Sequence, residues 1–364
     1  MKIAMIGQKG IPATHGGVER HVEELARRLV ARGHEVTAYL VLSHTDPQTT
    51  SYEGIELRSL PTVGTKHLDA IVNCGLASID TWAHGFDVIH YHAIGPALTS
   101  PLARVRGRSV VATIHAQDWR RQKWGGFASR VLKAGEWCAL NCANETICVS
   151  ERLSEEYRTV GQDVTYVPNG IALSDGEDTS ILDELGIPDT GYLLFAGRIV
   201  PEKGAHYLID AWRAAGRPLP LVIAGDTSFS NEYVGSLRSA EDEGVRFPGY
   251  VYGAKLAALF RHAALFVLPS DLEGLPIVLL EALGYGVPVL ASDIVPNVEV
   301  LGDKGQYFTA GNVDSLQREI LSSLSKIAEL RTQAETLRKS ALVEYDWEHV
   351  TDLTLKVYDD AMNI

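Results

Sequence analysis

Apolar and polar positions along the chain follow two alternating patterns. Short apolar runs that are typical of buried strands recur from the first residues onward, and each is followed by a longer amphipathic segment. Strands are therefore expected at Ile3–Ile6, Val36–Leu42, Val88–Tyr91, Val110–Ile114 and Thr146–Val149, and again at Tyr192–Ala196, Leu221–Ala224, Phe266–Leu268 and Val287–Ala291. Regular alternation of strands with helices favours an α/β fold in which helices cover parallel sheets.

The helical segments show the same regularity. Val18, Val22, Leu25 and Leu29 fall on one face of a helix predicted from Gly17 to Val30, and Gly33 just beyond it is a stop signal. The segment 344–364 is also amphipathic and opens with two aromatic residues. Between the two series of strands, the polar stretch 174–180 contains few apolar residues and is the natural place for a domain boundary. We therefore expect domains at 1–172 and 173–343, with a C-terminal helix at 344–364.

Composition narrows the class of protein. A chain of 364 residues with 46% hydrophobic content is long enough for two cores. Its apolar runs are too short to cross a membrane, and Met1–Gly7 resembles a first strand more than a secretion signal, so a cytoplasmic protein is expected. The four cysteines lack the spacing of a metal site and are expected to be reduced core thiols.

Charge is unevenly distributed. The net charge is −13, yet residues 104–133 hold eight Lys or Arg against one Asp, interleaved with Trp119, Trp124 and Phe127. A local basic patch on an acidic protein argues against general nucleic-acid binding. Two interpretations stay open: a solvated helix face, or a surface for anionic lipid headgroups at the inner face of a membrane.

Two glycine-containing loops suggest phosphate binding. The first runs from Gly7 to Gly17 and lacks the G-x-G-x-x-G spacing of a dinucleotide fold, but Gly16 and Gly17 directly precede a helix, whose free backbone N–H groups favour an anion. The second follows the strand ending at Ala196 and contains Gly197, Arg198 and Lys203. Arg and Lys in such a loop can converge on one diphosphate and neutralise the charge that develops when it leaves.

Two carboxylates lie eight positions apart in the second half. Glu273 follows an apolar strand, and Glu281 falls in the next helix, beyond Pro276, which suits a first helical position. Eight helical residues span about 12 Å, which suits two groups that hold opposite ends of an extended ligand. The backbone N–H groups of Gly274 and Leu275 lie between them. A sugar nucleotide, with hydroxyls at both ends and a diphosphate between, has this shape.

Histidines gather at the ends of two neighbouring strands. His115 ends one, followed by Gln117, Asp118 and Trp119, and His90 and His92 end the other. Three imidazoles at one rim raise the question of zinc, but no carboxylate or cysteine at ligand spacing accompanies them. We therefore expect no metal, and a satisfied edge residue or a polar wall for each histidine.

Taken together and in this order, these motifs resemble the retaining GT-B glycosyltransferases of family 4 over nearly the whole chain. The matching elements are Gly16-Gly17, the strand ending in His115, Val167-Pro-Asn-Gly170, Gly197-Arg198 with Glu202-Lys203-Gly204, and Glu273-x7-Glu281. The first half, with Gly10-Ile-Pro-Ala and His115-x-x-Asp-Trp, looks most like the branch that contains rhamnosyl and other transferases of surface-polysaccharide assembly.

The resemblance implies a fold and a reaction. Two Rossmann-like domains would face each other across a cleft, the first binding the acceptor and the second the donor, with the C-terminal helix returning to the first. The sugar of a UDP-, GDP- or dTDP-sugar would pass to a saccharide or lipid-linked acceptor with its anomeric configuration kept. No cofactor and no metal requirement is implied.

The resemblance also implies roles for particular residues. Glu273, Gly274 and Leu275 would bind the donor sugar, and Glu281 the ribose. Arg198 and Lys203 would bind the diphosphate, and His115 would orient the sugar. The remaining donor-side positions are Gly16, Gly17, Asn169, Gly197, Tyr250 and Val251. Gln117 departs from the branch, whose members often carry Leu there, so the acceptor side around Gln117, Asp118 and Trp119 is left open.

Two alternatives from other classes remain. A sugar-nucleotide epimerase or phosphorolytic enzyme would share the architecture without sharing the reaction. A non-catalytic sugar-nucleotide-binding or scaffold protein would keep the donor contacts and lose the acceptor chemistry.

Overall fold

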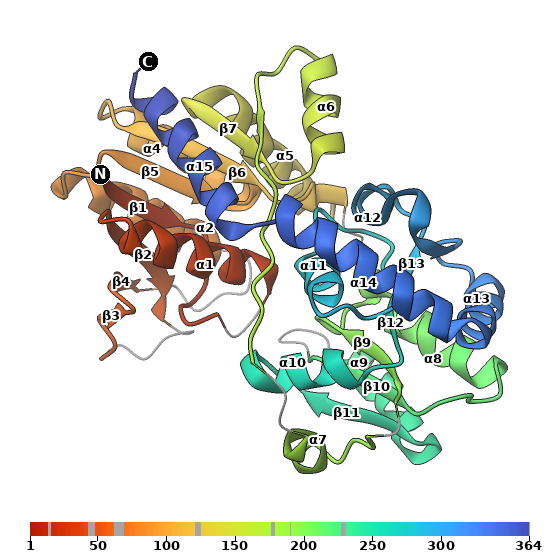
Figure 1. Cartoon of the computed structure of the whole chain (residues 1–364). Helices are drawn as coiled ribbons and strands as arrows, with labels where there is room; N and C mark the ends of the chain where they lie inside the picture. The colour runs from red at the N-terminus through yellow and green to blue at the C-terminus, as the bar shows by residue number, and fades with distance from the viewer. Residues whose placement is uncertain are drawn as a thin grey trace. The chain divides into compact units, whose positions relative to one another are not determined.

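The computed structural model describes residues 1–13, 16–42, 48–61, 69–120, 125–175, 179–189, 191–226 and 231–363 (Figure 1). The chain forms two compact units. Unit 1 consists of Met1–Gly170 together with Trp347–Ile364, and unit 2 of Ile171–Asp346. Both are α/β units built on a parallel sheet, as the alternating pattern predicts. Trp124, which belongs to the predicted basic and aromatic patch, lies outside the described residues.

Unit 1 contains an eight-stranded sheet with the order β3-β4-β2-β1-β5-β6-β7-β8. Its strands are β1 (Lys2–Ile6), β2 (Glu35–Val41), β3 (Ser51–Tyr52), β4 (Ile55–Leu60), β5 (Val88–His92), β6 (Ser109–Ile114), β7 (Glu145–Cys148) and β8 (Thr165–Tyr166). All neighbouring pairs are parallel except β3 and β4. The carboxyl ends of the parallel strands therefore meet at one edge, where ligands of α/β folds bind.

Helices and short 3₁₀ turns connect these strands. They are α1 (Gly17–Ala31), α2 (Asp69–Asp80), η2 (Thr81–Ala83), α3 (Ile94–Ala97), α4 (Ser100–Arg104), η3 (Asp118–Arg120), α5 (Gly126–Cys142), α6 (Glu151–Thr159) and, from the end of the chain, α15 (Trp347–Met362). Helix α1 buries Val22, Leu25 and Leu29 against the sheet and stops before Gly33, whose φ of 84° is a left-handed conformation that glycine adopts without steric cost.

Unit 2 contains a six-stranded sheet, wholly parallel, with the order β11-β10-β9-β12-β13-β14. Its strands are β9 (Leu193–Ala196), β10 (Leu221–Ala224), β11 (Val245–Gly249), β12 (Leu265–Leu268), β13 (Val289–Ser292) and β14 (Gln306–Phe308). Its helices are α7 (Ser180–Glu184), η4 (Pro201–Lys203), α8 (Ala205–Ala214), α9 (Asn231–Arg238), η5 (Ser239–Glu243), α10 (Gly253–His262), α11 (Ile277–Gly284), α12 (Val295–Leu301), η6 (Gly302–Lys304), α13 (Val313–Ser325) and α14 (Ile327–Glu344).

The last helix of the chain is part of the first unit. Helix α15 packs against α1 and against strands β5, β6 and β7, and Figure 1 shows it beside α1. Trp347, at its start, is buried, and its ring lies against Gly170: a Cβ on that glycine would stand 2.5 Å from the indole. The glycine of the Val167-Pro-Asn-Gly170 motif is therefore required by the close approach of α15.

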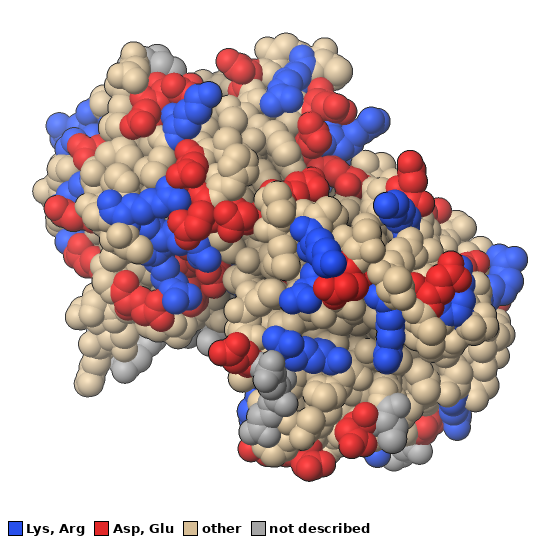
Figure 2. Space-filling model, viewed as in Figure 1, with Lys and Arg blue, Asp and Glu red and all other residues tan. Residues whose placement is uncertain are grey.

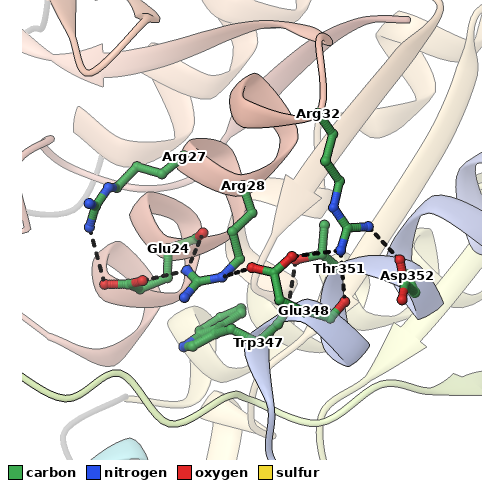
Figure 3. Close-up of polar contacts among 8 residues, drawn as sticks. All are labelled: Glu24, Arg27, Arg28, Arg32, Trp347, Glu348, Thr351 and Asp352. Carbon is green, nitrogen blue, oxygen red and sulfur yellow. Dashed lines mark hydrogen bonds and ion pairs between the residues drawn. The ribbon is translucent and has the colours of Figure 1, made fainter.

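Ion pairs join α15 to α1 on the outside of this contact (Figure 3). Glu348 accepts from Arg28 Nε at 3.1 Å and from Arg32 Nη2 at 2.8 Å, and Asp352 accepts from Arg32 Nη1 at 2.5 Å. The Arg28 guanidinium also lies 5.3 Å from the centre of the Trp347 ring. Figure 2 shows the result as interleaved basic and acidic side chains over the region of α1 and α15. These contacts fix where α15 lies on unit 1.

The predicted strands agree with the structure within two residues at each end. Five further strands were not predicted from the sequence: β3, β4, β8, β11 and β14. One local prediction was wrong: Pro276 is the N-cap of α11, with extended backbone, and the helix itself begins at Ile277. The cause is its ψ of 107°, which is outside the helical range.

Candidate functional site

The donor-side residues of unit 2 lie in two loops that leave the same edge of its sheet. Strands β9 and β12 are parallel neighbours, so the loop after β9, with Arg198 and Lys203, lies beside the loop after β12, with Glu273. A backbone hydrogen bond from Asp271 N to Glu202 O, 2.9 Å long, connects the two loops directly. These two motifs therefore lie side by side at one end of the sheet of this unit.

Lys203 and Glu273 form an ion pair at the centre of this edge. Lys203 Nζ donates to Glu273 Oε1, and Ser270 Oγ donates to the same oxygen at 2.7 Å. The two charged side chains are only 17% and 7% exposed, respectively. A charge held in a largely desolvated position must be paired and hydrogen-bonded, and here both conditions are met. The carboxylate of Glu273 therefore has a fixed orientation.

A chain of hydrogen bonds behind the pair holds Ser270 in turn. Ser292 Oγ, at the end of β13, donates to Ser270 O at 2.6 Å, and Asn297 Nδ2 donates to Ser292 O and Oγ at 3.0 Å each. All three side chains are buried. Sequence reasoning missed them, because single Ser and Asn residues at strand ends look the same as ordinary turn residues. Their role is to orient the Glu273 loop.

Gly204 allows the Lys203 loop to approach the Glu273 loop. Its φ is 71°, and a Cβ there would lie 2.0 Å from the carbonyl oxygen of Pro269. Any other residue would force the two loops apart. Helix α8 begins at the next position, Ala205, so the same glycine also directs the chain from the loop into the helix.

Arg198 is half-buried in the loop before Lys203. Within the described part of the chain no carboxylate forms an ion pair with it, in contrast to Lys203. An arginine guanidinium with uncommitted donors is suited to bidentate recognition of phosphate oxygens. The convergence of Arg198 and Lys203 on one anion stays a prediction.

The remaining donor-side residues of unit 2 lie on or before α11 and after β11. Glu281 is buried on α11, four residues after the first residue of that helix, and Leu275 is buried in the loop before it. Tyr250 and Val251 follow β11 at the same edge of the sheet, and the Tyr250 ring stacks with Tyr252 at 6.0 Å between centres. The loops after β9, β11 and β12 thus leave the same side of the parallel sheet, and Glu281 lies on the helix that follows β12.

The histidines of unit 1 form one cluster at the carboxyl ends of β5 and β6. The ring of His115 lies 4.8 Å from that of His21 and 5.7 Å from that of His92, and the tilted rings of His90 and His92 lie 4.0 Å apart between centres. His21 comes from α1 and was missed by sequence reasoning, because a polar residue inside an amphipathic helix is usually exposed. Its Nδ1 is 2.8 Å from Asn169 Oδ1, which gives the predicted Asn169 a contact within this unit.

Burial keeps these imidazoles neutral. Desolvation lowers the pKa of His21 to about 4, against a smaller opposing effect of its hydrogen bond to Asn169. Desolvation also holds the pKa values of His90, His92 and His115 well below the ordinary value, and the charge of neighbouring histidines adds to the effect. His115 therefore offers a neutral ring to a ligand, as a hydrogen-bond donor or acceptor.

The predicted acceptor-side residues are tied to a polar pair on other elements. Gln117 Nε2 donates to Tyr157 OH at 3.4 Å, and Trp119 Nε1 donates to Glu136 Oε2 at 3.1 Å. Tyr157 OH in turn donates to Glu136 Oε1 at 2.5 Å. Asp118 lies between them in η3 and is half-buried. Glu136 and Tyr157 were not predicted, and they give the segment around Gln117 a defined position.

The aromatic side chains exposed in the basic and aromatic patch differ in part from those predicted. Trp119 is half-buried, with Lys133 Nζ 4.5 Å and the Arg120 guanidinium 5.2 Å from its ring centre. The exposed aromatic side chains are instead Phe127, 81% exposed, and Trp137, 60% exposed, both on α5. Among the described residues, no helix combines the length and apolarity needed to span a membrane.

Gly16 and Gly17 belong to unit 1, at the start of α1. Gly16 is the N-cap, with φ 91°, and as a glycine it provides no side chain to cap this helix end. The phosphate-binding interpretation of this helix start stays a prediction.

Two family models match the chain in succession: one described as Glycosyltransferase Family 4 over residues 15–175, and one described as Glycosyl transferases group 1 over residues 178–339. An uncharacterized glycosyltransferase of Methanocaldococcus jannaschii is 28% identical, over 100% of this chain and 99% of that protein.

Solved structures have the same fold. Sucrose-phosphate synthase from Thermosynechococcus elongatus matches with a TM-score of 0.84 and 19% identity, over 98% of each chain. The Anabaena protein HepE, in complex with UDP and glucose, matches with a TM-score of 0.81 and 20% identity, over 99% of each chain. With two parallel α/β units, a fixed Lys203–Glu273 pair and these matches, the chain belongs to the family 4 glycosyltransferases of the GT-B fold.

Proposed function

We propose that this glycosyltransferase moves a sugar, with retention of its anomeric configuration, from a nucleoside-diphosphate sugar to a hydroxyl of a saccharide or lipid-linked acceptor. The product class is a cell-surface polysaccharide or glycoconjugate. One observation carries the proposal: the desolvated pair of Lys203 and Glu273, in which Ser270 orients the carboxylate and the lysine belongs to the loop that also contains Arg198. The UDP and glucose found with HepE support a nucleotide sugar as donor.

Each charged group has a part in donor binding. Lys203 and Arg198 neutralise the diphosphate, and Glu273 accepts hydrogen bonds from hydroxyls of the donor sugar. The backbone N–H groups of Gly274 and Leu275 add donors at the start of α11, and Glu281 binds the ribose hydroxyls. A diphosphate entering this edge would share Lys203 with Glu273, so the lysine couples recognition of the sugar to recognition of the leaving group.

The family resemblance implies the course of the proposed reaction. The bond between the anomeric carbon and the diphosphate oxygen breaks, and the electron pair leaves with the diphosphate. The acceptor oxygen forms its bond to the anomeric carbon from the same face, and its proton passes to the departing diphosphate. The cations Arg198 and Lys203 act at the position where negative charge grows, which is where charge stabilisation is most effective. No protein carboxylate is assigned as a covalent nucleophile.

For unit 1, the proposal retains the roles that the family resemblance implies. His115 orients the donor sugar through a neutral ring, and Gly16 and Gly17 present backbone N–H groups to a phosphate. Gln117, Asp118 and Trp119 belong to the acceptor side. Their fixed contacts with Tyr157 and Glu136 support a preformed surface there. No metal is required for binding of the diphosphate.

Acceptor-free hydrolysis tests the function. The protein is incubated with UDP-, GDP- and dTDP-sugars after a thermal-shift screen has identified which one stabilises it by mass action. A transferase slowly releases free sugar and nucleoside diphosphate. A changed sugar still attached to its nucleotide would identify an epimerase, and tight binding without turnover would identify a binding protein. Either outcome would replace the proposal.

Helix α5 supports a lipid-linked acceptor. Phe127, Arg130, Lys133 and Trp137 are exposed along one side of this helix, so the two cations lie between two aromatic side chains. Anionic lipid headgroups match this combination. We expect binding to vesicles that contain phosphatidylglycerol, weaker in high salt, and its loss in Phe127→Ser/Trp137→Ser. Val343→Ser, at a similarly exposed position on α14, is the matched control. Equal binding to neutral vesicles at all salt concentrations would contradict this surface.

A further inference from the structure

Three of the histidines in unit 1 converge on one point. His21 from α1, His92 from the end of β5 and His115 after β6 each offer a ring nitrogen, and these nitrogens lie within 4.8 Å of one another. His21 and His92 are buried, and His115 is partly exposed. The neighbouring His90 is excluded, because its two nitrogens already contact Tyr358 OH at 2.7 Å and Thr113 Oγ1 at 2.6 Å.

The spacing is close to that of a metal site. Zinc binds imidazole nitrogen at about 2.0–2.1 Å, so two nitrogens of a tetrahedral site lie about 3.4 Å apart. His115 Nε2 and His92 Nδ1 are 3.5 Å apart. The third nitrogen, on His21, lies farther out but within the same 4.8 Å limit. A metal ion bound by all three histidines would draw this nitrogen closer to the other two.

The contacts around the cluster favour coordination. Asn169 Oδ1 lies 2.8 Å from His21 Nδ1, and this oxygen can only accept, so it directs the proton to Nδ1 and leaves the lone pair on Nε2. A hydrogen bond to the remote ring nitrogen is the usual way in which proteins orient a metal-binding histidine. His92 Nε2 is buried and has no hydrogen-bond partner among the described residues. No hydrogen bond from a described residue outside the cluster therefore fixes the tautomer of this ring.

We propose that His21, His92 and His115 form a binding site for a divalent transition metal ion with a preference for imidazole, such as Zn²⁺. Three neutral nitrogen ligands suit zinc, copper or nickel and do not suit Mg²⁺ or Ca²⁺, which prefer oxygen. The partly exposed His115 leaves the fourth position open to water. The sequence-based argument against zinc considered His90, His92 and His115. In the structure, the three histidines that converge are His21, His92 and His115.

The site has a consequence for turnover that rests on the proposed function. A bound metal occupies the lone pair of His115 and removes this ring from the donor sugar. Zn²⁺ at the cluster is therefore an inhibitor of transfer and has no part in binding the diphosphate. Binding of the metal itself does not depend on the proposed function.

The test uses the untagged full chain, freed of metal with a chelator and titrated with Co²⁺, whose visible absorption reports coordination by nitrogen, and then with Zn²⁺ to displace it. One equivalent is expected to bind, and Mg²⁺ is expected to leave the spectrum unchanged. His115→Gln should weaken binding roughly 100-fold or more, and Asn169→Ala about 10–100-fold, the range for loss of an orienting partner. His206→Gln, in unit 2, is the control.

Two outcomes would overturn the site: no change in the Co²⁺ spectrum at protein-equivalent concentration, or unchanged affinity in His115→Gln. Because His115 is the least buried of the three, that variant remains informative if His21→Gln does not fold. Inhibition is measured separately, as nucleoside diphosphate release with and without Zn²⁺. Tight binding without inhibition would leave the metal site in place and contradict only the role of His115 in the proposed function.

Discussion

The two sheets end in opposite kinds of polar group. In unit 1, the carboxyl ends of β5 and β6 carry buried imidazoles whose pKa values are lowered by desolvation, so the region has polar atoms without charge. In unit 2, the ends of β9 and β12 carry Lys203 and Glu273 as a nearly buried ion pair. Two parallel sheets of similar topology can therefore carry different polar groups at the carboxyl ends of their strands: charged groups that suit a charged ligand in one unit, and neutral groups that suit an uncharged ligand in the other.

The two edges also differ in how the chain builds them. The residues of the unit 2 network lie at or after the ends of β9, β12 and β13, which are neighbours in one sheet, or on the adjacent helix α12, and all fall within Ile171–Asp346. The unit 1 cluster needs a residue from α1 and is bordered by Trp347, whose ring lies 5.4 Å from that of His21. A sequence scan that follows strand ends therefore recovers the first kind of site more completely than the second.

The largest effect is expected where charge meets the leaving group. Arg198→Ala or Lys203→Ala should lower kcat/KM for the donor about 10²–10³-fold, or about 2.7–4 kcal/mol of lost transition-state stabilisation. Arg246→Ala, an exposed arginine on β11, is the control and should keep full activity. Steady-state kinetics with the donor identified by thermal shift provide the measurement. Wild-type rates in both variants would remove the diphosphate role from this edge.

The second-largest expected effect is a loss of folding stability of unit 1 as the pH falls. In the unfolded chain His21 titrates near 6.5, whereas in the folded protein its pKa is about 4. The unfolded state therefore binds more protons between these values, and stability falls as the pH drops from about 6.5 to about 4. The loss for His21 alone is of the order of 3 kcal/mol, and the other buried histidines add to it.

Urea unfolding between pH 8 and pH 4, with a chelator present and tryptophan fluorescence as readout, measures this loss. His21→Gln should flatten the pH dependence, whereas His262→Gln in unit 2 should leave it unchanged. If stability were constant across this range, the histidine cluster would not be buried and neutral in solution.

A smaller effect tests the contact between the loop at residue 170 and α15. Gly170→Ala places a Cβ into the Trp347 ring and should destabilise unit 1 by about 1–3 kcal/mol, the usual range for overpacking. Gly85→Ala is the control, because a Cβ there meets no atom within 4 Å. Thermal unfolding followed by circular dichroism compares the two. Equal melting temperatures would show that the indole moves away at little cost.

The smallest effect is expected from the ion pairs between α1 and α15. Glu348→Gln removes the carboxylate that pairs with Arg28 and Arg32, at a side chain that is 61% exposed. Exposed pairs contribute about 0.2–1 kcal/mol, and salt screens them. The variant should therefore differ from wild type at low ionic strength and match it in 1 M NaCl. A difference that persists in high salt would indicate a packing role for Glu348.

Sequence reasoning recovered those parts of the fold whose physical signal is local. Long apolar strands, the amphipathic face of α1 and the turn at Gly33 follow from periodicity and backbone preference, and the structure confirms them. Strands β3, β8 and β14 were missed because two or three residues give no periodic signal, and their pairing depends on neighbours distant in sequence.

For the candidate site, the sequence identified residues with suitable side chains but did not show which of them contact one another. Lys203 and Glu273 were both predicted, but as residues that bind different parts of a donor. Their ion pair and the hydrogen bond from Ser270 to the carboxylate form because β9 and β12 are neighbours in the sheet, which the sequence does not reveal. His21 was missed because its burial depends on β5 and β6, which lie far along the chain.

The position of α15 has a consequence for how the protein is made. Unit 2 is one continuous stretch, whereas unit 1 lacks its last helix until residues 347–364 have left the ribosome. Domains usually mature in the order of synthesis. Here most of unit 1 is synthesised first, but the sheet surface that α15 covers stays exposed until all of unit 2 has been synthesised.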